Sequence, residues 1–148
     1  MAPDPMSAAF EEARAAGARG EVPIGAAIAR DGAIIASAGN RTIADTDPTA
    51  HAEILAIRAA GAALGSQRLA DCDLYVTLEP CAMCAGAISF ARLRRLYYAA
   101  SDAKGGAVEH GPRFFTQPTC HHAPDVYGGI RESEAAALLR AFFEARRN

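Results

Sequence analysis

The sequence predicts an α/β protein in which helices cover both faces of a mixed sheet. Segments with helical periodicity alternate with short apolar segments typical of strands, and no linker or repeat divides the chain, so we expect a single domain. The apolar runs 22–29 and 33–38 flank Asp31-Gly32, a favoured two-residue hairpin turn, and should therefore be antiparallel strands. The strands expected at 74–78 and 96–100 have a helix between them and can therefore be parallel.

The other elements of the first half follow from helical spacing and polar breaks. Apolar side chains recur at helical spacing across 7–18, and Ser7 is a suitable N-cap for that helix. The polar, turn-rich segment 40–48 predicts a loop that leads to a second helix. This second helix should start near His51 and end before Gly65, because glycine commonly follows the last turn of a helix.

The second half has one ambiguous region between clearer elements. The segment 81–90 is apolar on nearly all sides, so we expect a helix in the centre of the protein. Residues 105–129 mix glycine, proline and aromatic residues without a firm period and predict no particular element. The chain should end in a helix that Ser133 can cap and in which Phe142 and Phe143 belong to an apolar stripe.

Composition and charge limit the possible functions. With 51% hydrophobic and 22% charged residues, the 148-residue chain has the balance of a globular protein. It has no run of about 18 apolar residues that could span a membrane, and no secretory signal is visible, so we expect a cytoplasmic protein without membrane contact. A formal net charge of -2 disfavours broad, nonspecific binding to nucleic acid.

Two short segments together contain three typical zinc ligands and one additional carboxylate. His51 precedes Glu53 by two residues, and Cys81 and Cys84 follow Pro80 at a spacing that places both thiols on one face of a helix. A structural zinc ion takes four protein ligands, whereas a catalytic zinc ion keeps one position for water. The three ligands therefore predict one catalytic Zn2+, with the remaining carboxylate as proton carrier.

Each of these segments has a simpler interpretation when it is taken alone. A Cys-x-x-Cys pair can be a redox pair or half of a structural zinc site, and a single histidine on a helix is usually packed or solvated. Together, however, the segments match the pattern H-x-E…P-C-x-x-C, which is the known signature of zinc-dependent nucleobase deaminases. The prediction of a catalytic metal site thus rests on a match to a known motif.

The two remaining cysteines carry no comparable signal. Cys72 and Cys120 lack the spacing of a disulfide framework. The tripeptide Cys120-His121-His122 could suggest a second metal site, but adjacent ligands point in different directions and no carboxylate pattern completes the set. We interpret this tripeptide as part of a surface or dimer-contact loop.

Further segments make the chain similar to bacterial tRNA-specific adenosine deaminases of the cytidine deaminase-like superfamily. Besides the two zinc-ligand segments, these are 21–26, 102–107 and 138–147, so the similarity spans nearly the whole chain. The resemblance implies a three-layer α/β/α fold, one Zn2+ per subunit and a homodimer. It also implies conversion of adenosine to inosine at the wobble position of a tRNA anticodon, in the family an arginine tRNA.

The resemblance further implies roles for individual residues. His51, Cys81 and Cys84 would hold the zinc ion, and Glu53 would carry protons between water and the purine. The positions that match substrate-contacting residues of the family are Asn40, Ile24, Leu78, Asp102, Lys104, Phe142, Phe143, Arg146 and Arg147.

These implied substrate contacts form three groups. Asn40 would bind the target nucleoside through its side-chain amide, between pocket walls formed by Ile24 and Leu78. Asp102 and Lys104 match the loop that approaches the RNA backbone in relatives. The two phenylalanines would lie beside the flipped anticodon base, and the two arginines would pair with phosphate. Without the resemblance, the asparagine is a turn residue, the apolar side chains are packing residues and the arginines are solvated.

One region departs from the family pattern. Many relatives have a histidine-containing strand before the last helix, whereas this chain has 118–127, with prolines at both Pro118 and Pro124. Because proline cannot donate a hydrogen bond to a sheet, a regular strand over the whole segment is doubtful.

Three functions remain open from the sequence alone. The first is deamination of adenosine in tRNA, which the segment 102–107 and the C-terminal tail favour. The second is deamination of a free base or nucleoside of the guanine, cytosine or adenine type, which uses the same zinc chemistry and which the negative net charge slightly favours. The third is a zinc-stabilised binding module without catalysis, against which the intact Glu53 argues.

Overall fold

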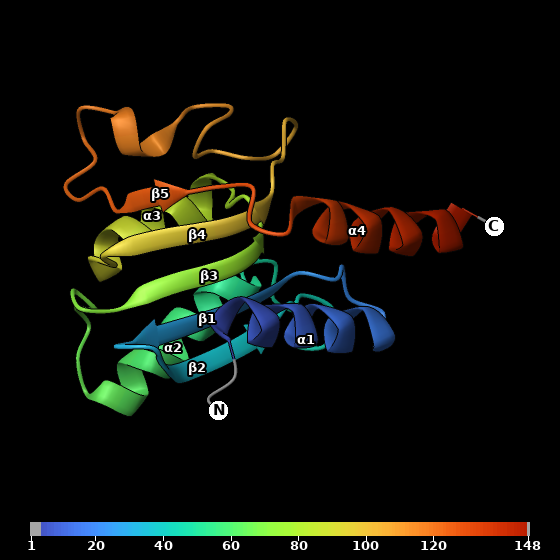
Figure 1. Cartoon of the computed structure of the whole chain (residues 1–148), viewed down its shortest axis with the longest axis horizontal. Coiled ribbons are helices and arrows are strands. Elements are labelled where there is room, and N and C mark those ends of the chain that lie inside the picture. Colours follow the sequence, from blue (N-terminus) through green and yellow to red (C-terminus); the bar gives the residue numbers. More distant parts are fainter. Residues whose placement is uncertain (1–3, 148) are drawn as a thin grey trace.

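A five-stranded mixed sheet forms the centre of the molecule, with the strand order β2-β1-β3-β4-β5 (Figure 1). The structure is a computed structural model that describes residues 4–147, with Arg147 described by its backbone only. The strands are β1 (Gly25–Arg30), β2 (Ala33–Gly39), β3 (Asp73–Leu78), β4 (Arg95–Ala100) and β5 (Asp125–Tyr127). β1 is antiparallel to β2 and β3, whereas β3, β4 and β5 are parallel. The sequence predicts the antiparallel pair β1–β2 and the parallel pair β3–β4, but not the pairing of β1 with β3.

Helices cover the sheet on both faces, which gives three layers. The helices are α1 (Pro5–Ala18), α2 (Ala52–Leu64), α3 (Ala82–Ala91) and α4 (Glu132–Arg147), and a short 3-10 turn, η1, spans Phe114–Thr116. α2 and α3 pack on one face, while α1 and the base of α4 pack on the other (Figure 1). The predicted α/β/α fold is therefore confirmed. In the described part of the chain, none of these helices combines the length and the apolar character needed to cross a membrane.

Side chains that alternate along the strands build the two apolar layers. Leu74 and Val76 of β3 belong to the core that includes α2 and α3. Tyr75, which lies between them in the chain, packs against the other core, which includes Phe10 of α1 and Ala135 of α4. This alternation is the expected geometry of a strand that is buried on both faces.

The element boundaries agree with the sequence except at two N-caps. Asp4 caps α1 by accepting a hydrogen bond from the backbone N–H of Ser7 (3.2 Å), so Ser7, expected to be the cap, lies within the helix. α4 begins at Glu132, so Ser133 also lies inside its first turn rather than at the cap. In both cases the sequence offers an acidic residue just upstream of the serine, and the helix extends back to include the serine.

The helix α3 is less central than the sequence suggested. Its inner side chains, such as Ile88, are fully buried against the sheet, but Met83 is 38% exposed and Phe90 is 77% exposed. Because α3 forms part of an outer layer, one side of this apolar helix must face away from the sheet. The prediction of burial on nearly all sides was therefore wrong for the single chain.

The segment that departs from the family pattern forms mostly irregular structure at the sheet edge. β5 begins directly after Pro124 and is only three residues long, which agrees with the doubt about a long strand. Cys120 contacts the Ser89 hydroxyl (3.6 Å) and the carbonyl of His122 (3.2 Å). Among the residues that the structure describes, this tripeptide forms no cluster of metal-ligating side chains.

Candidate zinc centre and active site

Three metal-ligating side chains meet where the N-termini of α2 and α3 come together. The ligand atoms of His51, Cys81 and Cys84 all lie within 4.8 Å of one another. The Nδ1 atom of His51 lies 3.7 Å from Sγ of Cys81 and 3.5 Å from Sγ of Cys84. Two thiols and one imidazole are a donor set that suits Zn2+, and three protein ligands leave one position for water.

The local backbone explains why these side chains are free to bind a metal. His51 and Cys81 are the N-cap residues of α2 and α3, both in extended conformation, and neither side chain makes a capping hydrogen bond. Cys84 lies one turn into α3, on the same side as Cys81. Since helix N-termini favour negative charge, this location helps to keep the sulfur atoms as thiolates.

The pKa values of the two thiols shift in opposite directions. Hydrogen bonds from Cys84 and His51 lower the pKa of Cys81 to about 4. The hydrogen bond to Cys81, together with burial, raises the pKa of Cys84. A bound cation would favour the deprotonated form of both residues, because the thiolate is the metal-binding form.

Glu53 lies in the first turn of α2 beside the cluster. The side chain is almost completely buried, and this burial raises the pKa of the carboxyl group to about 7, with the charge of Cys81 adding to the increase. A carboxyl group with a pKa near neutrality can both accept and release a proton at physiological pH. The geometry therefore places a carboxyl group that can carry a proton next to the metal-ligating group.

Asn40 holds the start of α2 in place. Its Oδ1 atom accepts a hydrogen bond from the backbone N–H of Ala52 (2.8 Å), the residue between His51 and Glu53. Arg19 in turn donates a hydrogen bond to the backbone carbonyl of Asn40 (2.9 Å). This contact could not be predicted from the sequence, because it joins residues that are twelve positions apart through the irregular loop 40–50.

A cavity of about 580 Å³ lies at the ends of β3 and β4, beside α4. Its lining includes Leu78, Asp102, Arg140 and Phe143. The metal-ligating side chains do not line this cavity, but Leu78 lies only three residues before Cys81. The structure thus brings together three of the expected substrate contacts, Leu78 from β3, Asp102 from the loop after β4 and Phe143 from α4.

Ile24 and Phe142 lie elsewhere. Ile24 is partly buried against the core formed with α2 and α3, and its carbonyl accepts the backbone N–H of Asn40 (3.1 Å). Phe142 faces a separate groove beside α1, where the guanidinium of Arg146 lies over its ring at 3.6 Å. Phe142 and Phe143 are perpendicular neighbours with ring centroids 5.4 Å apart, so each ring faces a different hollow.

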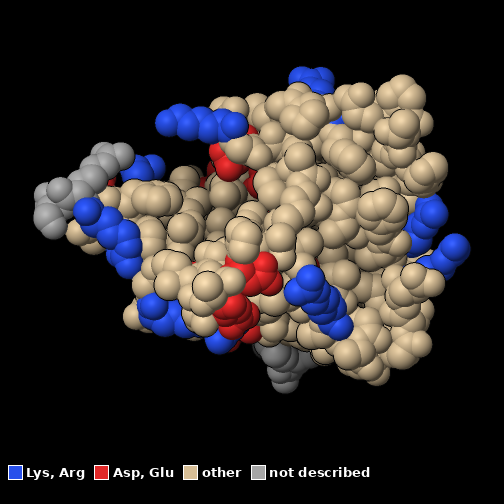
Figure 2. All heavy atoms as spheres, turned by 180° about the vertical axis from the view of Figure 1, so that it is seen from behind, with Lys and Arg blue, Asp and Glu red and all other residues tan. Residues whose placement is uncertain are grey.

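The remaining expected RNA contacts lie at the surface. Lys104 is exposed in the loop after β4, and Arg146 is exposed near the end of α4. The side chain of Arg147 falls outside the described residues. On the face shown in Figure 2, Lys and Arg side chains are scattered rather than gathered into one patch, and the surface is hollowed where α4 projects from the body.

Two buried carboxylates near the site were missed by the sequence analysis. Glu21 is 1% exposed and Glu79 is 2% exposed. Glu21 accepts hydrogen bonds from the backbone N–H groups of Ile43 and Ala44, in the loop before His51. A glutamate next to an apolar strand is the only sequence signal, and it does not reveal which backbone groups such a carboxylate binds.

Comparison with known families gives a match over most of the chain. Residues 3–100 match the family described as the cytidine and deoxycytidylate deaminase zinc-binding region. This segment contains all three metal-ligating residues and the buried Glu53.

Individual relatives are more specific. The chain is 66% identical to a tRNA-specific adenosine deaminase of Agrobacterium fabrum, with 96% of this chain and 93% of the relative covered. It is 42% identical to the protein of the same name from Bacillus subtilis, with 96% and 88% covered.

Solved structures agree with these relatives. A structure from studies of A-to-I editing by tRNA:A34 deaminases at the wobble position of transfer RNA matches with a TM-score of 0.89 and 66% identity, covering 90% of this chain and 97% of that one. A guanine deaminase from Nitrosomonas europaea matches with a TM-score of 0.81 at 28% identity, covering 96% and 85%.

Proposed function

We propose that this chain, which belongs to the zinc-binding cytidine and deoxycytidylate deaminase family, converts adenosine to inosine at the wobble position of a tRNA anticodon. Within the family it belongs to the tRNA-specific adenosine deaminases. It is a zinc-dependent hydrolase with one Zn2+ per subunit. The observation that carries this conclusion is the 66% identity to an enzyme of this activity over 96% of the chain. The cluster of His51, Cys81 and Cys84 beside Glu53 supplies the matching chemistry.

The reaction replaces the 6-amino group of adenine by an oxygen atom from water, so a C–O bond forms, a C–N bond breaks and ammonia leaves. His51, Cys81 and Cys84 would hold the zinc ion, which when bound makes water a nucleophile at neutral pH. Glu53 takes one proton from the attacking water and delivers it to N1 of the ring. It then takes the second proton from the oxygen now bonded to C6 and delivers it to the amino group, which leaves as ammonia. The backbone N–H of Cys81, at the start of α3, stabilises the oxygen that gains charge.

We assign the nucleoside contacts to residues around the start of α2 and the end of β3. Asn40 uses its side-chain oxygen to hold Ala52, which leaves its NH2 group as a donor for the substrate. Leu78 lines the cavity at the ends of β3 and β4 and forms one wall of the binding site. Ile24 does not line this cavity, but its carbonyl accepts the backbone N–H of Asn40, so we assign it to the part of the nucleoside pocket beside Asn40.

We assign the RNA contacts to the loop after β4 and to the end of α4. Asp102 and the exposed Lys104 approach the RNA backbone beside the cavity. Phe143 is 46% exposed at this cavity and can stack on an extruded base. Phe142 contacts the ring of Phe143 from the neighbouring groove, and the guanidinium of Arg146 lies over the ring of Phe142. Arg146 and Arg147 pair with phosphate.

We propose a homodimer, an arginine tRNA as substrate and a cytoplasmic location for this single-domain protein. The exposed Met83 and Phe90 lie seven residues apart on α3, a spacing that places both on one side of the helix, and such an apolar surface is typical of a protein–protein contact. The four cysteines are free thiols, which fits a reducing compartment. The resemblance to bacterial enzymes supports the arginine tRNA.

The proposed function is tested by offering several substrates to the purified, zinc-loaded protein. We expect inosine and ammonia from an anticodon stem-loop with adenosine at the wobble position, and much slower release from free adenosine, guanine and cytosine. Preferential release from guanine would instead support the activity of the guanine deaminase neighbour. Stem-loop binding without ammonia release from any substrate would identify a binding module and contradict the proposal.

A further inference from the structure

We propose that Glu79 is a positioning residue that fixes the loop of residues 101–110 in the conformation that faces the RNA. Glu79 follows β3 directly and precedes Pro80 and the metal-ligating Cys81. Its side chain is fully buried, although the loop that it contacts lies largely at the surface. The inference rests on the proposed function, because it assigns a role in RNA recognition to the carboxylate.

Both ends of the loop bind to the single carboxylate of Glu79. Oε1 accepts the backbone N–H of Asp102 (3.0 Å) and lies 2.7 Å from Nδ1 of His110. Oε2 accepts the backbone N–H groups of Val108 (3.2 Å), Glu109 (2.9 Å) and His110 (3.1 Å). Because the two ends of the loop bind to one side chain, loss of this carboxylate would release both together.

The loop also approaches Glu79 too closely for most side chains at one position. A Cβ atom on Gly106 would lie 2.5 Å from Cδ of Glu79 and 2.5 Å from the carbonyl oxygen of Asp102. Only glycine allows the chain to pass here without displacing the carboxylate or the loop. Immediately afterwards, the backbone N–H of Ala107 donates to the carbonyl of Pro80 (2.9 Å), which ties the loop to the zinc-ligand segment.

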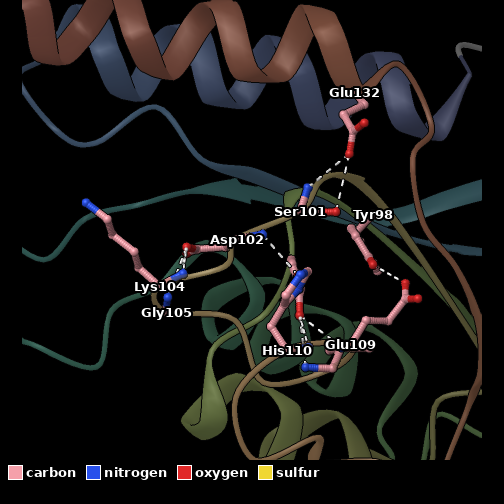
Figure 3. Close-up of polar contacts among 10 residues, drawn as sticks. Tyr98, Ser101, Asp102, Lys104, Gly105, Glu109, His110 and Glu132 are labelled. Carbon is pink, nitrogen blue, oxygen red and sulfur yellow. Dashed lines mark hydrogen bonds and ion pairs between the residues drawn. The ribbon is translucent and has the colours of Figure 1, made fainter.

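The remaining contacts transmit this anchoring to the exposed turn, as Figure 3 shows. Oδ1 of Asp102 accepts the backbone N–H groups of Lys104 (3.2 Å) and Gly105 (3.0 Å). Two peripheral contacts, Tyr98 with Glu109 and Ser101 with Glu132, connect the ends of the loop to β4 and α4. The position of the Lys104 side chain therefore depends on Asp102, and that of Asp102 on Glu79.

The carboxylate is well suited to this role because each of its two oxygen atoms contacts more than one group of the loop. Hydrogen bonds to a charged acceptor are stronger than those to a neutral one. The apolar anchors of the loop, Ala107 and Val108, lie in its second half, whereas residues 103–105 are exposed. The turn that carries Lys104 is thus held by polar contacts.

The test compares Glu79→Gln with Asp73→Asn in the full, zinc-loaded protein. Asp73 is a buried carboxylate at the opposite end of β3, where it pairs with Arg94 (3.0 Å), so it controls for the loss of a buried charge away from the site. For Glu79→Gln we expect KM and Kd for the wobble stem-loop to rise about tenfold, with kcat at saturation within about twofold of wild type. For Asp73→Asn we expect a lower Tm with KM and Kd unchanged.

A second variant keeps the test valid if Glu79→Gln folds poorly. Gly106→Ala leaves the carboxylate intact but displaces the loop from it, so we expect the same rise in KM. Combining the two substitutions should add little to either, because both remove one interaction. Zinc content should match wild type throughout. An unchanged KM in both variants, or a fall in kcat without a change in KM, would overturn the assignment.

Hydrogen exchange separates this inference from the proposed function. The amides of Asp102, Val108, Glu109 and His110 should exchange faster in Glu79→Gln than in wild type or Asp73→Asn, with no substrate present. If wild type fails to deaminate the stem-loop, the proposed function is wrong, and this exchange pattern still decides whether Glu79 holds the loop. Unchanged exchange at these amides would refute the positioning role directly.

Discussion

At the scale of single residues, the active site depends on where each side chain lies relative to a helix N-terminus. His51 and Cys81 occupy N-cap positions without acting as caps, and Glu53 enters the first turn as a buried acid. The N-terminal dipole favours thiolates, while burial favours the protonated carboxyl group. The same few residues therefore provide both a metal site and a carboxyl group that exchanges protons near neutral pH.

Replacing Glu53 by glutamine should separate metal binding from turnover. Glutamine has nearly the same shape but cannot carry protons, so we expect native zinc content and a fall in kcat of about 100- to 10,000-fold. Ammonia release and atomic absorption measure the two quantities. The exposed Glu11→Gln on α1 is the matched control and should retain wild-type turnover. Near-native turnover of Glu53→Gln would exclude the proposed proton carrier.

Replacing Asn40 by aspartate or leucine should separate its two contacts. Aspartate keeps an oxygen that can accept the N–H of Ala52, but it has no NH2 group to donate to a nucleoside. We expect Asn40→Asp to keep its Tm and zinc while its KM for the stem-loop rises about tenfold, since one neutral donor is lost. Asn40→Leu loses both contacts, so its Tm should fall as well. A native KM for Asn40→Asp would show that the Asn40 side chain contacts Ala52 but not the nucleoside.

The residues that sequence reasoning could identify are those whose signal is local. The spacing within His51-Ala52-Glu53 and Pro80–Cys84 predicts the residues of each helix start, and the match of both segments to a known motif predicts that their side chains meet. The contact of Glu79 with Val108 spans 29 positions and depends on how an irregular loop returns to the sheet. No periodic pattern encodes such a contact, so this anchoring residue was missed.

At the scale of elements, α4 presents its two phenylalanines to different surroundings. Phe143 is 46% exposed at the cavity, whereas Phe142 is covered by Arg146. We expect Phe143→Ala to weaken stem-loop binding about tenfold, since stacking on a base contributes about 1–3 kcal/mol, with little change in Tm. Phe142→Ala should mainly lower Tm, by removing packing against α1. Fluorescence anisotropy and thermal unfolding distinguish these outcomes, and equal effects of both variants on binding would contradict the assignment.

The outer side of α3 offers a test of assembly. If the exposed Phe90 lies in a homodimer interface, Phe90→Glu should introduce a buried, unpaired charge and shift the protein to monomers. Light scattering after gel filtration measures the mass directly. Phe90→Leu keeps an apolar side chain and should remain dimeric. An unchanged mass for Phe90→Glu would place the interface elsewhere.

Element boundaries were predictable where a residue imposes one backbone conformation. Asp31 and Gly32 adopt positive φ angles of 52 and 79 degrees, as a tight hairpin requires, and Gly65 ends α2 in the left-handed region. Several residues can serve as a cap, by contrast, and the choice between Asp4 and Ser7 depends on how far the helix extends. The sequence alone could not resolve that choice.

At the scale of the whole molecule, the order of periodic segments predicted much of the topology, but it did not predict the strand at the edge of the sheet. The alternation of helix and strand predicted four strands and the directions within the pairs β1–β2 and β3–β4, because short connections leave few arrangements. The pairing of β1 with β3, which joins these two pairs into one sheet, was not predicted. β5 adds only Asp125–Tyr127 after a long irregular stretch, and its pairing with β4 depends on tertiary contacts. A three-residue strand is too short to produce a periodic signal.

The buried carboxylates should make the stability of the whole fold sensitive to acid. Burial raises the pKa of Glu21, but hydrogen bonds from Ala44, Ile43 and Thr42 outweigh it, so the folded-state pKa lies below 4.5. A lowered folded-state pKa adds stability above the unfolded value, and this contribution disappears as the pH falls through the folded-state pKa. We therefore expect Glu21→Gln to unfold at lower urea concentration at pH 7, and to differ less from wild type at acidic pH. A constant difference between the two pH values would contradict this linkage.

The way in which Glu79 binds the loop of residues 101–110 affects how freely the sequence of that loop can change during evolution. The carboxylate binds backbone N–H groups at 108–110, so the amino acids at these positions can change without losing those hydrogen bonds, provided that none becomes proline. The exposed positions 103 and 104 are similarly unconstrained by packing, whereas a Cβ atom at Gly105 would lie 3.1 Å from Oδ2 of Asp102. Mutation can therefore vary the chemistry of this surface while its architecture persists, which gives related proteins a route to new RNA preferences without rebuilding the catalytic machinery.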